Sequence, residues 1–352
     1  MEFGLYSLSD LVPNPRDPRP VTAAGRIAET IAAAEHAEQA GLDVFGVGEH
    51  HRLDFAVSSP AIVLAAIAAR TERIRLTSAV TVLSAADPVR VFEDFATVDL
   101  ISDGRAEIMA GRGVFLDPFP LFGFDIDDYD ALFAEKFELL RRLGREERVT
   151  WQGRFRPALG QSEIAPRPIQ PEMPVWIAVG GTPQSAVRAG LLGAPMAFAS
   201  LGGPIANIGP VADLYRRGLQ QGGHPVGTGR LALTSHMHVG ATSQTARDDF
   251  YPHYAKYWAS ASPRGRNLPM MQRDQFEAAA GPNTALLVGS VTEVVDKILA
   301  MHEVAPFDRL IAQIDIGGLP MAEVRAVIDR FAGQVVPLVR SALGPVSIGL
   351  AA

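Results

Sequence analysis

The feature that most constrains the fold of this chain is a regular alternation between short apolar segments and longer helical segments. Eight apolar segments occur, and each is followed by a stretch with helical periodicity. Alternation of this kind is typical of parallel α/β structures, and eight units favour a closed (β/α)8 TIM barrel over an open sheet. The predicted strands are Glu2 to Leu8, Leu42 to Gly48, Ile74 to Val82, Ala106 to Ala110, Val175 to Val179, Met196 to Ser200, Leu231 to Val239 and Arg309 to Asp315.

Two segments interrupt the alternation. After the fourth helix, Val149 to Pro174 is rich in glycine and proline, which predicts an insertion with a short hairpin or two. Before the last strand, Ser260 to Leu287 is long, polar and loop-like, which suggests a lid over an active site; a plain surface loop is the alternative. We predict a single barrel domain over residues 1–340 and a C-terminal tail over 341–352.

Charge and composition argue against several classes of protein. The 352-residue chain has a net charge of −7 with both signs interspersed, which argues against a nucleic-acid surface. It has no cysteine, which excludes disulfides, thiolate metal sites and cysteine nucleophiles. The N-terminus does not resemble a signal peptide, and no apolar run approaches a membrane span. We therefore expect a cytoplasmic protein.

A glycine-rich turn follows the fifth predicted strand. Gly180-Gly181-Thr182-Pro183 combines two glycines with a good N-cap residue and a proline suited to the first helical position. Glycines let the backbone approach an anion closely, and a helix N-terminus offers unpaired N–H groups, so this turn can hold a phosphate. An ordinary tight turn with a good cap explains the same residues at least as well.

Arg112 lies between Gly111 and Gly113 at the end of the fourth predicted strand. An arginine there can reach the barrel mouth and bind a phosphate through bidentate hydrogen bonds. The alternative is a salt bridge to an acidic neighbour such as Asp117. Together, Arg112 and the glycine-rich turn favour a phosphate-bearing ligand, because each supplies what the other lacks.

Glu49-His50-His51 follows the second predicted strand. Histidine suits proton transfer near neutral pH. Side chains alternate along a strand, so only one of the two histidines is expected to face the barrel mouth. We expect His51 to be the structural one.

A metal-dependent hydrolase is a competing hypothesis. His236 and His238 lie on one face of the seventh predicted strand, and with Glu49, His50 and Asp315 they could bind a divalent cation. The objection is that His236 lies within the strand, where side chains pack the interior layers of a barrel.

These motifs together resemble those of the bacterial luciferase-like flavin monooxygenases. The resemblance covers nearly the whole chain and is densest at FGLYSL, GLDVFGVGEHH, Ser78 to Gly113, LFGFDIDD and Val288 to Ile298. The string EHH, the string DPVR and the arginine-glycine ending of the fourth strand recur in luciferase α subunits in the same order.

The resemblance implies a barrel that binds reduced FMN at the carboxyl ends of its strands. His50 falls on the catalytic histidine, which assists formation or breakdown of the flavin hydroperoxide, and Arg112 falls on the phosphate-binding arginine. A non-proline cis peptide is implied at Ala79-Val80. The implied cofactor-binding residues are Glu49, Ala79, Val80, Arg112, Gly113, Gly180, Gly181, Thr182 and Gln184.

Several positions depart from the luciferase pattern. Gly111 replaces a reactive cysteine, and Asp130 replaces an arginine near the phosphate, which weakens that side of the cradle. Gly181 and Gln184 replace a serine and a threonine, for which Thr182 and Ser185 could compensate. These changes argue against light emission and do not argue against flavin binding.

The resulting prediction is a two-component monooxygenase that uses reduced FMN from a separate flavin reductase and inserts one oxygen atom of O2 into a small organic substrate. The alternatives are an F420-dependent oxidoreductase, a non-catalytic flavin-binding protein and the metal-dependent hydrolase. By resemblance, we expect a homodimer that packs through the helices Pro60 to Arg70 and Pro88 to Leu100. A fairly apolar substrate pocket is indicated by Phe115, Phe119, Phe122, Phe124, Tyr257 and Trp258.

Overall fold

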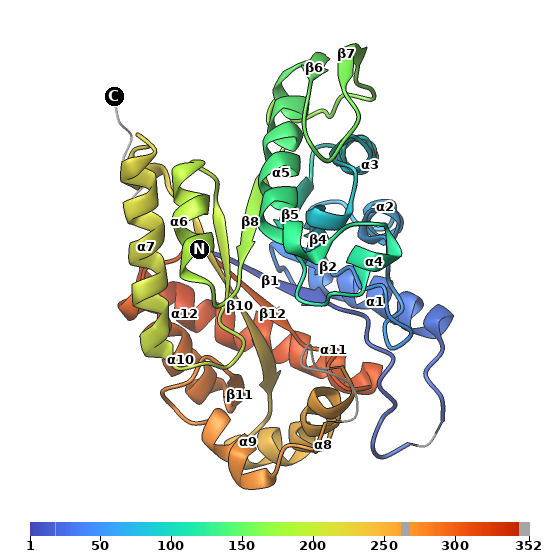
Figure 1. Cartoon of the computed structure of the whole chain (residues 1–352). Helices are drawn as coiled ribbons and strands as arrows, with labels where there is room; N and C mark the ends of the chain where they lie inside the picture. Colours follow the sequence, from blue (N-terminus) through green and yellow to red (C-terminus); the bar gives the residue numbers. More distant parts are fainter. Residues whose placement is uncertain (18, 262–267, 345–352) are drawn as a thin grey trace.

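The computed structural model of the protein describes residues 1–17, 19–261 and 268–344. Its centre is a barrel of eight parallel strands, which closes because β1 pairs with β2 on one side and with β12 on the other (Figure 1). The predicted (β/α)8 fold is therefore confirmed. The barrel strands, in order around the barrel, are β1 (Glu2–Ser7), β2 (Val44–Val47), β3 (Arg75–Ser78), β5 (Ala106–Gly111), β8 (Val175–Val179), β9 (Met196–Ala199), β10 (Leu231–Val239) and β12 (Arg309–Gln313).

Helices surround the barrel and cover its outer face. The first begins after Thr22, whose hydroxyl accepts a hydrogen bond from the Gly25 amide at 3.1 Å. The third begins at Pro88 because the Asp87 carboxylate accepts from the Val89 amide at 2.8 Å. The surrounding helices are α1 (Ala23–Gln39), α2 (Pro60–Ala68), α3 (Pro88–Ser102), α5 (Tyr129–Arg145), α6 (Pro183–Leu191), α7 (Ile208–Gln221), α10 (Val291–Val304), α11 (Met321–Arg330) and α12 (Val336–Leu343).

The third predicted strand is broken in two. β3 ends at Ser78, and a short strand β4 (Thr81–Val82) continues beside β5. Between them lies the peptide bond Ala79-Val80, which is cis although neither residue is proline. This confirms the cis peptide that the family resemblance implied at this position.

The insertion after α5 contains an antiparallel hairpin, β6 (Arg148–Trp151) and β7 (Leu159–Glu163). It lies apart from the barrel strands in Figure 1. The predicted hairpin within Val149 to Pro174 is therefore confirmed.

The segment before the last barrel strand is more ordered than the sequence indicated. Its polar residues suggested a loop over Ser260 to Leu287, but α8 (Ser243–Ala261) runs into it, and it contains α9 (Arg273–Ala279) and reaches β11 (Leu287–Gly289). The prediction of a loop throughout was wrong because Gln272 and Gln275 form a capping box and Phe276 is fully buried. Residues 262–267 of the predicted lid lie outside the described residues.

The predicted C-terminal tail also differs. Helix α12 continues to Leu343, so residues 341–343 belong to the last helix, and Val339 packs in the core. The remainder of that tail, 345–352, lies outside the described residues. Over the part of the chain that the structure describes, no helix combines the length and apolar character that a membrane span requires.

The amino end of the barrel is held by a buried network of ion pairs. The guanidinium of Arg309 binds Glu107 at 2.5 Å and Glu2 at 2.8 Å, and Arg309 and Glu107 are both fully buried. Burial alone would raise the pKa of Glu107, but the hydrogen bonds and charges of Arg309 and Arg75 outweigh it and hold that pKa below its ordinary value. Glu2 also binds Arg230 at 2.9 Å.

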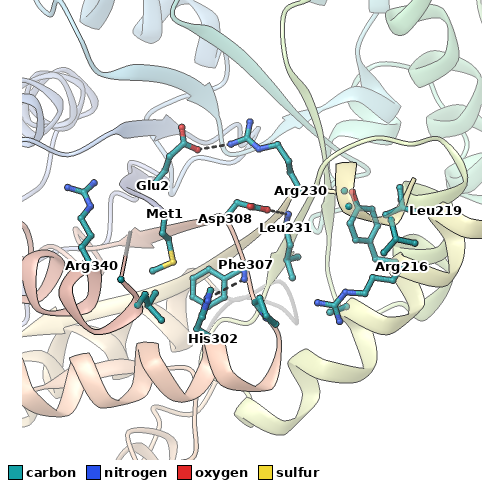
Figure 2. Close-up of a pocket in the computed structure, with 18 of the residues that line it drawn as sticks. Met1, Glu2, Arg216, Leu219, Arg230, Leu231, His302, Phe307, Asp308 and Arg340 are labelled. Atoms are coloured by element: carbon teal, nitrogen blue, oxygen red, sulfur yellow. Dashed lines mark hydrogen bonds and ion pairs between the residues drawn. The ribbon is translucent and has the colours of Figure 1, made fainter. Parts of the chain in front are cut away.

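A wide groove of about 1160 Å³ opens beside this network, between the amino ends of the strands and helices α7 and α12. Figure 2 shows the Glu2–Arg230 pair at its edge, together with Asp308 bonded to the Leu231 amide. In barrels of this type the amino end of the strands serves stability, whereas active sites lie at the carboxyl end. The groove is therefore not the candidate active site, although it is larger than the cavity described next.

Candidate active site

A partly open cavity of about 200 Å³ lies at the carboxyl ends of the barrel strands. Most of its lining is apolar, contributed by the ends of the strands, the loop after β5 and the last turns of α8. The lining side chains that carry a polar atom able to hydrogen-bond are Tyr6, Glu49, His50, His51, Thr234, His236, Tyr257 and Trp258. This combination of an apolar pocket with a few convergent polar groups is typical of a binding or active site.

His50 is packed against aromatic rings at the edge of the cavity. Its ring stacks on Phe55 with 3.9 Å between centroids, and Phe115 meets it edge-on at 5.1 Å. Burial lowers the pKa of His50 to about 3, with smaller effects from Arg52 and His51, so the ring is neutral at physiological pH. Its Nδ1 is buried without a hydrogen-bond partner in the described part of the chain. The imidazole can therefore accept a proton from a group in the cavity or donate one to it.

His51 and Glu49 form a hydrogen-bonded pair beside His50. The His51 Nε2 lies 2.9 Å from Glu49 Oε1, and Glu49 Oε2 accepts from the Val82 amide at 2.9 Å. His51 also lines the cavity, so the expectation that only one histidine would face the barrel mouth was wrong. The reason is that β2 ends at Val47, before these residues, and strand alternation no longer governs their directions.

Ala79 and Val80 line the cavity from the break between β3 and β4. Gly111 lies directly behind them, and a Cβ at that position would approach Val80 Cγ2 to 2.7 Å. The glycine that replaces the luciferase cysteine therefore allows this close approach, and no side chain at position 111 lies between β5 and Val80.

Arg112 contacts the start of α6, as the pairing of the two sequence motifs predicted. Its Nη2 donates to Ser185 Oγ at 2.8 Å, and its Nη1 binds Asp130 at 2.6 Å. The guanidinium also lies over the ring of Tyr129 at 4.8 Å. The acidic partner is thus Asp130, not the sequence neighbour Asp117, because helix α5 brings its first turn beside the end of β5.

Arg188 is a second cation at this point that the sequence analysis missed. It donates to the same Oδ1 of Asp130 at 2.9 Å, and the hydrogen bond from Arg188, followed by that from Arg112, holds the pKa of Asp130 below its ordinary value. Ser185 and Arg188 are three residues apart on α6 and so share a face of the helix. This three-residue spacing from Ser185 is the feature of the sequence that could have identified Arg188.

The turn between β8 and α6 is open to solvent. Gly180, Gly181, Thr182 and Gln184 are all exposed, and a Cβ built on either glycine would meet nothing within 4 Å. Neither glycine is required by packing or by a positive φ, whereas close approach of a ligand to the backbone would explain both. The Thr182 side chain does not cap the helix as predicted; its carbonyl accepts from the Ser185 amide at 3.0 Å instead.

These groups fit a phosphate. The donors are two guanidinium groups, the Ser185 hydroxyl and the Gln184 amide at the start of α6, and one carboxylate, Asp130, opposes them. The cluster also adjoins the cavity: Gly113 and Ala178, which line the cavity, are one residue from Arg112 and two from Gly180. A ligand can thus place a ring in the cavity and a phosphate on the turn.

The structure does not bring together the metal ligands of the hydrolase hypothesis. His236 lines the cavity, but the ring of His238 stacks on Phe250 with 5.1 Å between centroids. Within residues 1–17, 19–261 and 268–344, no three histidine or carboxylate side chains converge as metal ligands. Of the aromatic residues predicted for the pocket, Phe115, Tyr257 and Trp258 line it, whereas Phe119 is in the core.

Comparison with known proteins places this arrangement in a family. Residues 1–306 match the family model of the luciferase-like monooxygenases, so the chain belongs to that family. It is an oxidoreductase of the luciferase-like group, as the resemblance predicted.

Solved structures share the whole fold. The monooxygenase RslO1 from Streptomyces bottropensis is 26% identical with a TM-score of 0.81, over 96% of this chain and 99% of that one. The oxygenating constituent of 3,6-diketocamphane monooxygenase from Pseudomonas putida, in complex with FMN, is 18% identical with a TM-score of 0.76, over 96% and 98%.

A curated relative uses a different cofactor. The F420-dependent glucose-6-phosphate dehydrogenase of Amycolatopsis mediterranei is 32% identical over 161 residues, which are 44% of this chain and 48% of that protein.

Proposed function

We propose that this protein is a two-component monooxygenase that takes reduced FMN from a separate flavin reductase and transfers one atom of O2 to a small organic substrate. The observation that carries the proposal is the apolar cavity with a cationic, glycine-rich turn at its edge. The relative that was solved with FMN has the same fold over nearly the whole chain.

The residues divide between the two ends of such a ligand. Arg112, Ser185 and the turn Gly180-Gly181-Thr182 would bind the phosphate, with Gln184 and Gly113 beside it. Glu49, Ala79 and Val80 would contact the flavin ring in the cavity. Bound reduced FMN supplies the reaction with O2, and the protein supplies placement and exclusion of water.

His50 would move the proton that the reaction requires. The ring is neutral, it lies on the cavity wall, and its Nδ1 has no partner in the described part of the chain. A neutral imidazole at this place can accept a proton and return it. The stacked Phe55 ring fixes its orientation.

F420 remains the alternative cofactor, because a relative of this chain depends on it. A non-catalytic flavin-binding role is the other alternative. One experiment separates the three. The protein is loaded anaerobically with reduced FMN or with reduced F420, oxygen is then admitted, and cofactor absorbance and peroxide release are followed.

The proposed function predicts binding of reduced FMN and reoxidation through a transient absorbance change that free FMN does not show. Binding of F420 alone would favour hydride transfer. Binding of FMN with the reoxidation rate of free flavin would favour a carrier protein. Binding of neither cofactor would overturn the proposal.

We also propose a homodimer that packs through α2 and α3. These helices lie side by side and expose Ile62, Leu100 and Ile101 to solvent, with Ile62 72% exposed. Burial of such a face in a second copy removes apolar area from water. Sedimentation of the Ile62→Asp variant tests this proposal, and a shift towards monomer is the expected result.

A further inference from the structure

One wall of the cavity is an aromatic cage around a single histidine. His236 of β10 lines the cavity, and its ring centroid lies 5.7 Å from Tyr254, 6.2 Å from Tyr257 and 6.5 Å from Trp258. The three aromatic residues come from α8, and Tyr257 and Trp258 also line the cavity. The cage therefore holds the His236 ring at a fixed place among three aromatic side chains.

The His236 ring has one nitrogen available to a ligand. Burial lowers the pKa of His236 to about 4, so the ring is neutral at physiological pH. Its Nδ1 lies 3.3 Å from the Tyr254 hydroxyl, and no described residue hydrogen-bonds its Nε2. That Nε2 can donate or accept one hydrogen bond, depending on the tautomer.

A second uncharged polar group lies beside it. Gln313 of β12 is opposite His236 in the strand register and points to the same side as Ile311, which lines the cavity. Its side chain is fully buried, and neither its amide oxygen nor its amide nitrogen has a partner in the described part of the chain. Buried amides are nearly always hydrogen-bonded, so this one is unusual, and it lies next to His236 in the register although it does not itself line the cavity.

The cavity offers no cation to an anionic substrate. Among the described residues, neither lysine nor arginine lines it, and the one carboxylate, Glu49, is already bonded to His51 and the Val82 amide. An unpaired carboxylate in such a place would lose its hydration without compensation. The substrate group that enters the cavity must therefore be uncharged.

The segment that follows β5 exposes both apolar and acidic side chains. Its exposed apolar side chains, here called the apolar rim, are Val114, Leu116, Leu121 and Phe122, which are between 49% and 67% exposed. Val114 also lines the cavity, and the Phe122 ring lies 4.9 Å from the His51 ring. The same loop carries the exposed residues Asp117, Asp125 and Asp127, which repel anions.

We propose that the site takes an uncharged, largely apolar substrate with one hydrogen-bonding oxygen, which His236 holds while the apolar remainder lies along the rim. This inference rests on the proposed function, because it specifies the substrate of the same cavity. It excludes carboxylates and other anions as substrates.

The experiment uses octanamide and octanoate, two probes of the same length that differ in charge. Their binding to the FMN-loaded protein is measured at pH 8 by calorimetry. The expected result is at least about tenfold tighter binding of octanamide. His236→Phe should weaken octanamide binding by roughly five- to tenfold, the size of one lost neutral hydrogen bond. His236→Gln, which keeps a donor and an acceptor, should restore most of it.

His238→Phe is the matched control, because it changes a histidine of the same strand that stacks on Phe250 and does not line the cavity. Its octanamide affinity should equal that of the unchanged protein. Equal affinity for octanoate, no binding of either probe, or an unchanged affinity in His236→Phe would overturn the inference. Loss of FMN binding in the unchanged protein would instead overturn the proposed function, and the same probes would then be titrated into the cofactor-free protein.

Discussion

At the amino end of the barrel, the buried charges are matched: Arg309 binds both Glu107 and Glu2, and the indole of Trp176 donates to Glu107 at 3.1 Å. At the carboxyl end, some buried polar atoms have no partner: His50 Nδ1 and both side-chain polar atoms of Gln313 lack a hydrogen bond in the described part of the chain. Both ends are built on the same strands, yet the ion pairs of the amino end satisfy its buried charges, whereas the carboxyl end leaves these atoms unsatisfied.

The difference separates stability from binding. Buried polar groups that are left unpaired cost free energy, so a fold retains them where a ligand completes them. The larger groove at the amino end is lined by groups that already have partners, such as Glu2 with Arg230. The volume of the two cavities alone would therefore point to the wrong end of the barrel as the binding site.

The largest effect is expected from a substitution that breaks the network of ion pairs at the amino end. Arg309→Met leaves Glu107 buried without its main partner, and the loss of unfolding free energy should be about 3–5 kcal/mol. Denaturant unfolding followed by fluorescence measures it. The control is Arg216→Met, which removes an exposed arginine paired with Asp213 and should change stability by less than about 0.5 kcal/mol. Equal stability of the two variants would contradict the account.

The carboxyl end should make the protein sensitive to acid. Burial lowers the pKa values of His236 and His238 to about 4, so the unfolded chain binds their protons first as the pH falls below about 6.5. Each histidine then removes on the order of 3 kcal/mol of stability between about pH 6.5 and 4. Asp10 opposes this trend, because burial raises its pKa to about 7 and the folded state gains a proton there.

Comparison of variants isolates the histidine contribution. His238→Phe keeps the ring stacked on Phe250 and removes one titrating group, so the variant should lose less stability than the unchanged protein between pH 6.5 and 4.5. Urea midpoints at several pH values measure this difference. Identical pH profiles would show that His238 is not buried and neutral as described.

His50→Ala tests the carboxyl end for catalysis. General acid–base catalysis contributes roughly 10²–10⁴-fold, so oxygen transfer by the FMN-loaded enzyme should slow by about that factor. FMN affinity should change little, because the phosphate cluster is intact. If the variant lost FMN binding instead, His50 would have a structural role.

Arg112→Ala should have the opposite effect to His50→Ala: it should weaken FMN binding more than it slows oxygen transfer. Loss of a charge-assisted hydrogen bond costs about 1.5–3 kcal/mol, which corresponds to roughly a 10- to 100-fold higher Kd. Equilibrium dialysis with FMN measures it, and Arg154→Ala, whose arginine pairs with Asp128 on the surface, serves as the control. Equal losses in both variants would indicate nonspecific charge effects.

The smallest effect concerns the carboxylate that opposes the phosphate. Asp130 binds both Arg112 and Arg188 and is 63% exposed. Asp130→Asn removes that competitor, so FMN should bind a few-fold more tightly, measured by the same dialysis. Weaker binding would mean that Asp130 positions the two arginines for the ligand.

The barrel was predictable because its apolar segments are strong and regularly spaced. The positions of His50 and Arg112 at the carboxyl end of the barrel were predictable because both residues follow closely after a strand. The directions of side chains beyond the strand ends were not predictable. Both His50 and His51 reach the cavity because the chain has left the strand. Helix α9 was missed because its polar composition suggested a loop, whereas a glutamine capping box starts the helix and the burial of Phe276 stabilises it.

His236 illustrates the other limit. Its place within a predicted strand suggested an interior packing layer, and only the three-dimensional arrangement shows that the cavity extends down to it. The importance of Arg188 likewise depends on α5 and α6 meeting at Asp130, a contact between residues 58 positions apart.

Anaerobic titration with reduced FMN tests the central claim most directly, with the quenching of tryptophan fluorescence as the signal, because Trp258 lines the cavity. The account predicts saturable binding of one FMN per chain, competition by inorganic phosphate, and a weaker affinity in Arg112→Ala. Absence of binding, or binding that phosphate and Arg112→Ala leave unchanged, would contradict it.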